Sequence, residues 1–127
     1  MPLLPRSTYV LLVITSLAEA ATGILLLVSP SIFSRLLFGE EIAGVGVAMS
    51  RIAAVILIAL GVACWPNANA RGAVFGMLTY SILVMLYLIV VGISGTAGVL
   101  LWSAVAVHAG LSVLLIRAWW KQPKSAA

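Results

Sequence analysis

Four long apolar stretches follow one another along the chain, and short polar segments separate them. The stretches cover about residues 9–28, 43–65, 73–93 and 98–119. A helix rises 1.5 Å per residue, so about 20 apolar residues cross the ~30 Å hydrocarbon core of a bilayer. The pattern therefore predicts four membrane-spanning helices joined by short turns, which makes sequential helices antiparallel neighbours.

A shorter segment with helical periodicity, about residues 30–38, separates the first two stretches. Ser29 suits a helix cap, Pro30 suits the first helical position and Gly39 suits the end. One face would hold the apolar side chains of Ile32, Phe33, Leu36 and Leu37. We expect a short amphipathic helix that lies in the membrane interface and covers one end of the bundle.

The composition narrows the class of protein further. The chain has 127 residues, of which 64% are hydrophobic and 8% charged, and its mean hydropathy is +1.25. Soluble domains carry about 25% charged residues. We therefore expect an all-α integral membrane four-helix bundle, a single domain over residues 1–127. The net charge of +4 comes from scattered cations without a basic stripe, which argues against a nucleic-acid partner.

The first apolar stretch also has features of a secretory signal peptide. Arg6 precedes it, and Ala18, Glu19 and Ala20 imitate a cleavage site. The apolar run nevertheless continues to Val28. We therefore expect a retained transmembrane helix.

The charges between the stretches predict the orientation. With four spans, one side of the membrane would carry Arg6, Arg71, Arg117, Lys121 and Lys124. The other side would carry Arg35 beside Glu40 and Glu41. Because Lys and Arg favour the cytoplasmic side, we expect a multi-pass protein of the cell inner membrane with both termini in the cytoplasm. The tryptophans at the same end, Trp65, Trp119 and Trp120, agree with this orientation.

Small residues spaced four apart predict close helix packing. The pairs are Gly44 with Ala48, Gly46 with Ser50, Gly72 with Gly76, and Ala106 with Gly110. Such pairs occur where membrane helices approach closely. They do not distinguish packing within one bundle from the interface of a homo-oligomer.

Three ionisable residues, Glu19, Arg51 and His108, lie inside the predicted spans. Counted from the outer helix ends at 1.5 Å per residue, their depths are roughly 13, 12 and 15 Å. An arginine at a helix centre costs roughly 2.5–3.5 kcal/mol on insertion scales, which a carboxylate partner would offset. We expect a Glu19–Arg51 ion pair in one layer with His108. Side chains that could complete the hydrogen bonding are those of Tyr80, Ser50, Ser103 and Trp102.

Two interpretations of this layer remain open. It is either a structural ion pair with a satisfied histidine, or a site for a small amphipathic ligand, ion or proton, because intramembrane charges mark such places. In the second case Glu19 would titrate, Arg51 would hold a carboxylate or headgroup oxygen, and His108 would donate or accept a proton.

No pattern of catalytic or cofactor-binding residues accompanies the charges. The chain has one histidine and one cysteine, Cys64, too few for a His-rich metal site or an intrachain disulfide. Glycine-rich phosphate loops and haem patterns are absent from the sequence. We expect no metal and no cofactor, and the sequence proposes no reaction.

Two family resemblances follow from particular segments. Leu17-Ala18-Glu19 in a first helix resembles the small multidrug resistance transporters, whose first-helix glutamate binds cationic drugs; Arg51 and the third span depart from that pattern. Gly23–Gly39 (GILLLVSPSIFSRLLFG) and Ser50–Trp65 (SRIAAVILIALGVACW) resemble small bacterial four-helix membrane proteins of DoxX-like type. The second resemblance implies the four-helix fold with an interfacial helix and carries no catalytic residues.

The sequence thus supports three hypotheses of function. The first is a membrane protein that binds a small lipophilic or amphipathic molecule at Glu19, Arg51, His108, Tyr80 and Trp102, with transport of that molecule as an extension of the hypothesis. The second is an accessory or scaffold subunit of a larger membrane complex without a ligand of its own. The third, with least support, is a membrane enzyme acting on a lipid or quinone.

Overall fold

The computed structural model describes residues 4–122 and is built from five helices within that range. They are α1 (Arg6–Val28), α2 (Pro30–Phe38), α3 (Val45–Ala63), α4 (Ala70–Ile93) and α5 (Leu101–Lys121). All except α2 are long and apolar enough to cross a membrane. The helix ends lie within three residues of the positions predicted from the apolar pattern. The prediction of an all-α membrane bundle with a short helix between the first two spans is confirmed.

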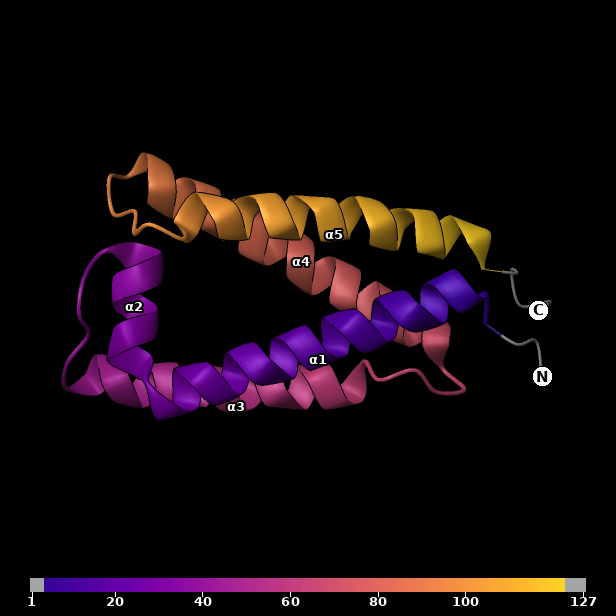
Figure 1. Cartoon of the computed structure of the whole chain (residues 1–127), viewed down its shortest axis with the longest axis horizontal. Helices are drawn as coiled ribbons and strands as arrows, with labels where there is room; N and C mark the ends of the chain where they lie inside the picture. Colours follow the sequence, from indigo (N-terminus) through magenta and orange to yellow (C-terminus); the bar gives the residue numbers. More distant parts are fainter. Residues whose placement is uncertain (1–3, 123–127) are drawn as a thin grey trace.

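The long helices form two antiparallel pairs, α1 with α3 and α4 with α5. The pairs approach each other where both chain termini lie and diverge toward the opposite end, where α2 lies across the opening (Figure 1). We call these the terminal end and the α2 end. The terminal end contains the start of α1, the turn between α3 and α4, and the end of α5.

Two glycines bring α1 and α3 together. A Cβ atom at Gly61 would lie 2.6 Å from the Ser16 carbonyl oxygen, and one at Gly23 would lie 2.7 Å from the Ala54 carbonyl oxygen. Only glycine permits such an approach of backbones between membrane helices. The predicted small-residue pairs have a lesser part in this packing: a Cβ at Gly110, for example, would meet nothing within 4 Å.

The hydrophobic core lies at the terminal end. It joins α1, α4, α5 and the residues between α3 and α4, and its members are Leu12, Cys64, Ala70, Ala73, Val74, Met77, Leu115 and Ala118. At the same end the Arg71 guanidinium lies 4.6 Å from the centre of the Trp119 ring, and Phe75 packs against that ring. Side chains from both helix pairs therefore interlock here.

At the α2 end, backbone hydrogen bonds connect the pairs. The N–H groups of Gly98 and Leu100 donate to the carbonyls of Leu37 and Leu36, at 3.0 and 2.9 Å. The last carbonyls of a helix have no partner within it, so the α4–α5 connection satisfies those of α2. Gly98 touches the Leu36 carbonyl so closely that a Cβ atom would clash with it.

The ends of α2 match the sequence prediction in part. Pro30 occupies the first turn, and Gly39 ends the helix in the left-handed conformation with φ of 79°. Ser29 stands at the cap position, but its side chain makes no capping hydrogen bond. The buried face of α2 contains Pro30 and Ser34, whereas Ile32 is exposed, so part of the apolar face points away from the protein.

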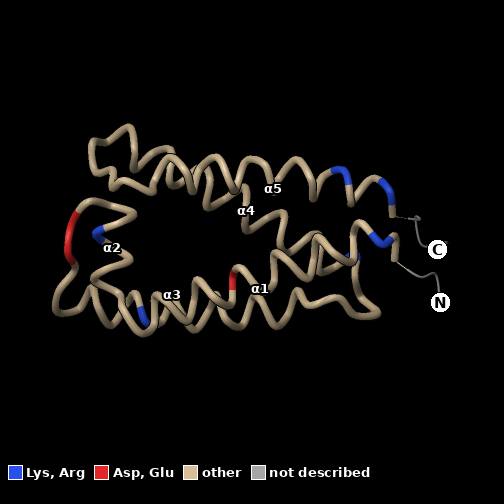
Figure 2. The backbone as a smooth tube through the Cα atoms, in the orientation of Figure 1, with Lys and Arg blue, Asp and Glu red and all other residues tan. Residues whose placement is uncertain are grey.

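Most charged residues lie near the two ends, whereas Glu19 and Arg51 lie within α1 and α3 (Figure 2). Arg6, Arg71, Arg117 and Lys121 belong to the helix termini and turn of the terminal end. At the α2 end Arg35 forms an ion pair with Glu41. Lys124, which also entered the predicted charge bias, lies outside the described residues. The separation of charge that the sequence predicted is thus present between the two ends.

Candidate functional site

The face that α1 turns toward its neighbours is unusually polar for a membrane helix. Its buried residues include Thr8, Thr15, Ser16 and Glu19, whereas Leu17 and Ile24 are exposed. Hydrocarbon solvates apolar side chains well and polar ones poorly, so a membrane helix turns its polar side chains to the protein interior. Glu19 is 5% exposed, and the carboxyl group therefore belongs to the interior between the helix pairs.

Tyr80 of α4 and His108 of α5 lie beside Glu19. The Tyr80 hydroxyl lies close to the Glu19 carboxyl group. The Tyr80 and His108 rings meet edge to face, with centroids 5.8 Å apart and an interplanar angle of 73°. We call Glu19, Tyr80 and His108 the polar cluster; Tyr80 is its central member.

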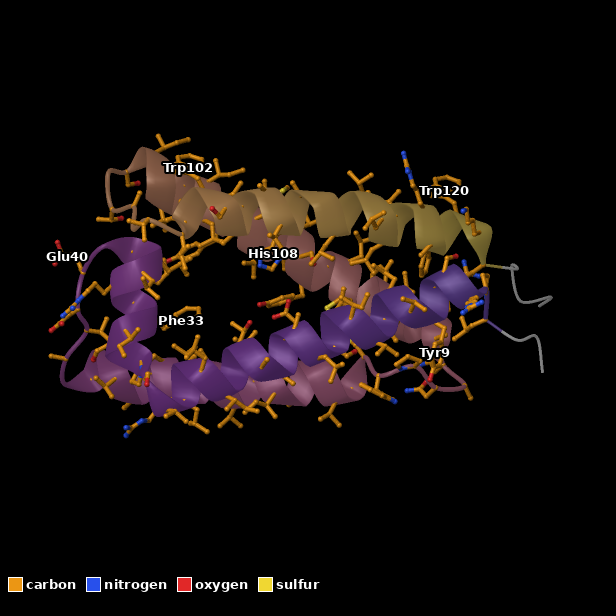
Figure 3. The ribbon with its side chains drawn as sticks, in the orientation of Figure 1. Tyr9, Phe33, Glu40, Trp102, His108 and Trp120 are labelled. Carbon is orange, nitrogen blue, oxygen red and sulfur yellow. The ribbon has the colours of Figure 1, made fainter. Side chains whose placement is uncertain are left out.

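The polar cluster lies where the packed core ends and the helix pairs begin to diverge. Tyr80 packs against the core, and His108 points from α5 toward the region between the pairs (Figure 3). Phe33 of α2 projects toward the same region from the other side. Tyr80 and His108 are partly exposed, so the polar cluster is not sealed completely by the surrounding helices.

Several buried polar atoms around the cluster have no hydrogen-bond partner within residues 4–122. They are His108 Nδ1, Ser16 Oγ and Ser81 Oγ. Ser16 lies one turn before Glu19, and Ser81 follows Tyr80. A buried polar group without a partner costs about 1–3 kcal/mol. His108 Nδ1 belongs to the polar cluster and Ser16 lies one turn from Glu19 on α1, so polar atoms of another molecule would be stabilised beside them.

Arg51 does not join Glu19, and the predicted ion pair is wrong. Arg51 lies on an exposed part of α3, and within the described part of the chain the ion pair that forms is Arg35–Glu41. Two glycine contacts set the register of α1 and α3. Gly23 packs against Ala54 and Ile58, and Gly61 packs against Ser16 and Ala20. If the same register continues toward the start of α3, Arg51 lies level with the end of α1. That position is about 13 Å from Glu19 along the axis of α1.

Trp102, Ser50 and Ser103 also lie away from the cluster. Trp102 is 52% exposed and packs across Gly92 at the far end of α4. The Ser50 hydroxyl donates to the Val47 carbonyl at 2.9 Å, and Ser103 is exposed. Of the predicted site residues, the structure thus brings together Glu19, Tyr80 and His108.

Sequence reasoning did not single out Ser16 and Ser81, which are buried on the helices that carry Glu19 and Tyr80. Ser16 could have been found from the spacing of Thr8, Thr15 and Glu19, which share one face of a helix. Ser81 gives no comparable signal, because α4 is apolar on all sides. Cys64, by contrast, is buried in the core, as expected for a small apolar residue.

The chemistry available to the polar cluster is hydrogen bonding and charge compensation. A carboxylate accepts, a phenol both donates and accepts, and an imidazole presents one donor and one acceptor when neutral. Among the described residues no three His, Cys, Asp or Glu side chains gather closely enough to hold a metal ion.

Fold and site together define a multi-pass membrane protein with an ionisable cluster between two helix pairs. Comparisons with protein-family models, with curated proteins and with solved structures find no match to this chain.

Proposed function

We propose that the protein binds a small lipophilic or amphipathic molecule between its two helix pairs, at the polar cluster. The observation that carries this proposal is the buried Glu19 carboxyl group, which lies beside Tyr80 and forms no ion pair with a Lys or Arg of residues 4–122. Ionisable groups inside a membrane are expensive to keep, and those that face the bundle interior mark ligand or ion pathways. The atoms of His108 and Ser16 that have no hydrogen-bond partner within residues 4–122 support the same conclusion.

The cluster favours a ligand with a positive charge or hydrogen-bond donors. Glu19 would accept from such a group, and the Tyr80 ring adds a face that attracts cations. Arg51 does not bind an anionic group of the ligand in this proposal, because it lies on an exposed part of α3 away from the polar cluster. Transport of the ligand would require α1 and α3 to move against α4 and α5, which the sparse contact between the pairs near α2 permits.

Binding of tetraphenylphosphonium, a lipophilic cation, to the purified protein in nanodiscs tests this proposal. We expect saturable binding that Glu19→Gln weakens about tenfold or more, because a hydrogen bond to a charged group contributes about 1.5–3 kcal/mol. Tyr80→Phe should weaken it less. Arg51→Gln is the matched control, since it removes a charge of the same membrane-spanning region outside the cluster. Equal binding to the parent and Glu19→Gln proteins, or no saturable binding to the parent, would overturn the proposal.

The second candidate function is that of an accessory subunit in a larger membrane complex. It draws support from α3, whose side chains are mostly exposed and include Arg51. A helix of a partner protein would cover the exposed apolar side chains of α3, and an acidic group on that helix would pair with Arg51. In that case Arg51→Gln would reduce the size of the detergent-solubilised assembly, and Glu19→Gln would leave it unchanged.

We also propose that the terminal end faces the cytoplasm of a cell with an inner membrane. Its cations, Arg6, Arg71, Arg117 and Lys121, are the residues that the positive-inside rule places there. Accessibility of a terminal peptide tag in intact and permeabilised cells tests this orientation. Protection of the tag until permeabilisation supports it, and labelling of intact cells contradicts it.

A further inference from the structure

A groove separates the start of α1 from the end of α5 at the terminal end. Its volume is about 600 Å³, and both helices contribute to its walls. That volume is in the range of sites for small organic ligands, about 300–1,000 Å³. The groove is distinct from the polar cluster, which lies deeper along the bundle.

The outer part of the groove is strongly basic. Arg6, Arg117 and Lys121 line it, and all three are exposed. The acidic residues of the sequence, Glu19, Glu40 and Glu41, are absent from its lining. Among residues 4–122, no carboxylate side chain therefore lines the groove beside the three cations.

The inner part of the groove is apolar. Val10, Ile14 and Leu114 line it and remain substantially exposed, at 44%, 57% and 48%. At 1.5 Å per residue, the apolar wall extends about 10–12 Å inward from Arg6 and Lys121. The groove thus changes from cationic at the helix ends to apolar toward the membrane interior.

A third observation comes from the Thr8 hydroxyl. Thr8 lines the groove, is 1% exposed, and its Oγ1 atom has no hydrogen-bond partner within residues 4–122. The other threonines of α1 behave differently: the Thr15 hydroxyl donates to the Leu11 carbonyl at 2.9 Å, and that of Thr22 donates to the Ala18 carbonyl at 2.8 Å. Such bonds within the helix are the usual arrangement. The buried Thr8 hydroxyl thus has no partner among these residues, and a turn of its side chain would present it to a ligand in the groove.

We propose that this groove binds an anionic phospholipid. The phosphate lies among Arg6, Arg117 and Lys121 with the Thr8 hydroxyl donating to it, and an acyl chain lies against Val10, Ile14 and Leu114. Basic pockets between membrane helices select anionic headgroups in this way. The cationic outer part of the groove corresponds to the position of a phospholipid headgroup in its leaflet, and the apolar inner part corresponds to the position of the acyl chains. The proposal is independent of ligand binding at the polar cluster.

Binding of dioleoylphosphatidylglycerol tests the proposal, with dioleoylphosphatidylcholine as the neutral comparison. Retained lipid is counted by native mass spectrometry of the detergent-solubilised full chain, and thermal unfolding in detergent without lipid confirms that each variant is folded. We expect preferential retention of phosphatidylglycerol by the parent protein. Arg117→Gln should weaken it about fivefold, the contribution of one basic residue near an anionic surface.

Arg71→Gln is the matched control for Arg117→Gln. Arg71 belongs to the same end of the molecule, but it stacks on Trp119 and does not line the groove. Retention by Arg71→Gln should stay close to that of the parent. Equal losses in the two variants would overturn the proposal, because general attraction between a basic surface and anionic lipid would then explain the binding.

Two further measurements separate a lipid from a soluble anion. Leu114→Trp fills the apolar part of the groove and should reduce retention of phosphatidylglycerol, and Thr8→Val should reduce it by removing the hydroxyl. Inorganic phosphate should not displace the lipid at concentrations that leave the protein folded. Displacement by phosphate, together with full retention by Leu114→Trp, would identify a soluble-anion site and overturn the lipid proposal.

Discussion

The two ends of this molecule are held together by different interactions. At the terminal end, side chains of α1, α4 and α5 interlock in a core that includes Leu12, Met77 and Leu115. At the α2 end, the backbone of the α4–α5 connection bonds to the backbone of α2 at Leu36 and Leu37. Packing holds one end closed, and hydrogen bonds hold a short helix across the other.

This difference shows how a small bundle can combine stability with access to its interior. In a membrane, association of helices depends on van der Waals packing and hydrogen bonds, because lipid already solvates apolar side chains. A core at the terminal end gives the two pairs a fixed junction. The polar cluster borders that junction, so one side of it is rigidly packed and the other faces the diverging pairs.

The larger loss of stability should come from Met77→Ala, which leaves a cavity in the core at the terminal end and so tests the packed end of the comparison. Met77 is fully buried, and we expect a loss of about 2 kcal/mol, the lower part of the range for such truncations, because lipid also solvates the side chain. Thermal unfolding in detergent micelles measures the loss. Leu83→Ala, at a position of α4 that is 61% exposed, is the matched control and should leave the unfolding temperature nearly unchanged. Equal effects of the two substitutions would show that the terminal core is not the main junction.

A smaller and more local effect should come from Gly98→Ala at the α2 end. The added Cβ atom would clash with the Leu36 carbonyl and break two backbone hydrogen bonds, each contributing about 0.5–1.5 kcal/mol. Hydrogen exchange should accelerate at the Gly98 and Leu100 amides while the terminal core stays protected. Gly110→Ala is the control, because a Cβ atom there has open space around it. If Gly98→Ala leaves exchange unchanged, the backbone contact does not hold α2 in place.

The sequence predicted the helices well because the membrane imposes a strict length requirement. About 20 apolar residues must cross the hydrocarbon core, and backbone groups there must bond within the helix. The bounds of α1, α4 and α5 follow from that requirement. Pro30 and Gly39 similarly mark the ends of α2 through their own backbone preferences.

The sequence could not predict how far the helices slide along one another. The expected Glu19–Arg51 pair assumed that the outer ends of the first two spans lie in one plane. The contacts at Gly23 and Gly61 set a different register, in which the start of α3 extends past the end of α1. Glu19 and His108 both lie beside Tyr80, and their common depth in the membrane stays a prediction.

The contact between α2 and the α4–α5 connection has a consequence for the order of assembly. A chain enters the membrane from its N-terminus, and segments far apart in sequence meet late. The carbonyls of Leu36 and Leu37 are made early, but the amides that satisfy them belong to the connection between α4 and α5. Until that connection is in place, those carbonyls must bond to interfacial water. Docking of α2 is therefore completed only when α5 joins the bundle, and a chain arrested before α5 lacks these two hydrogen bonds.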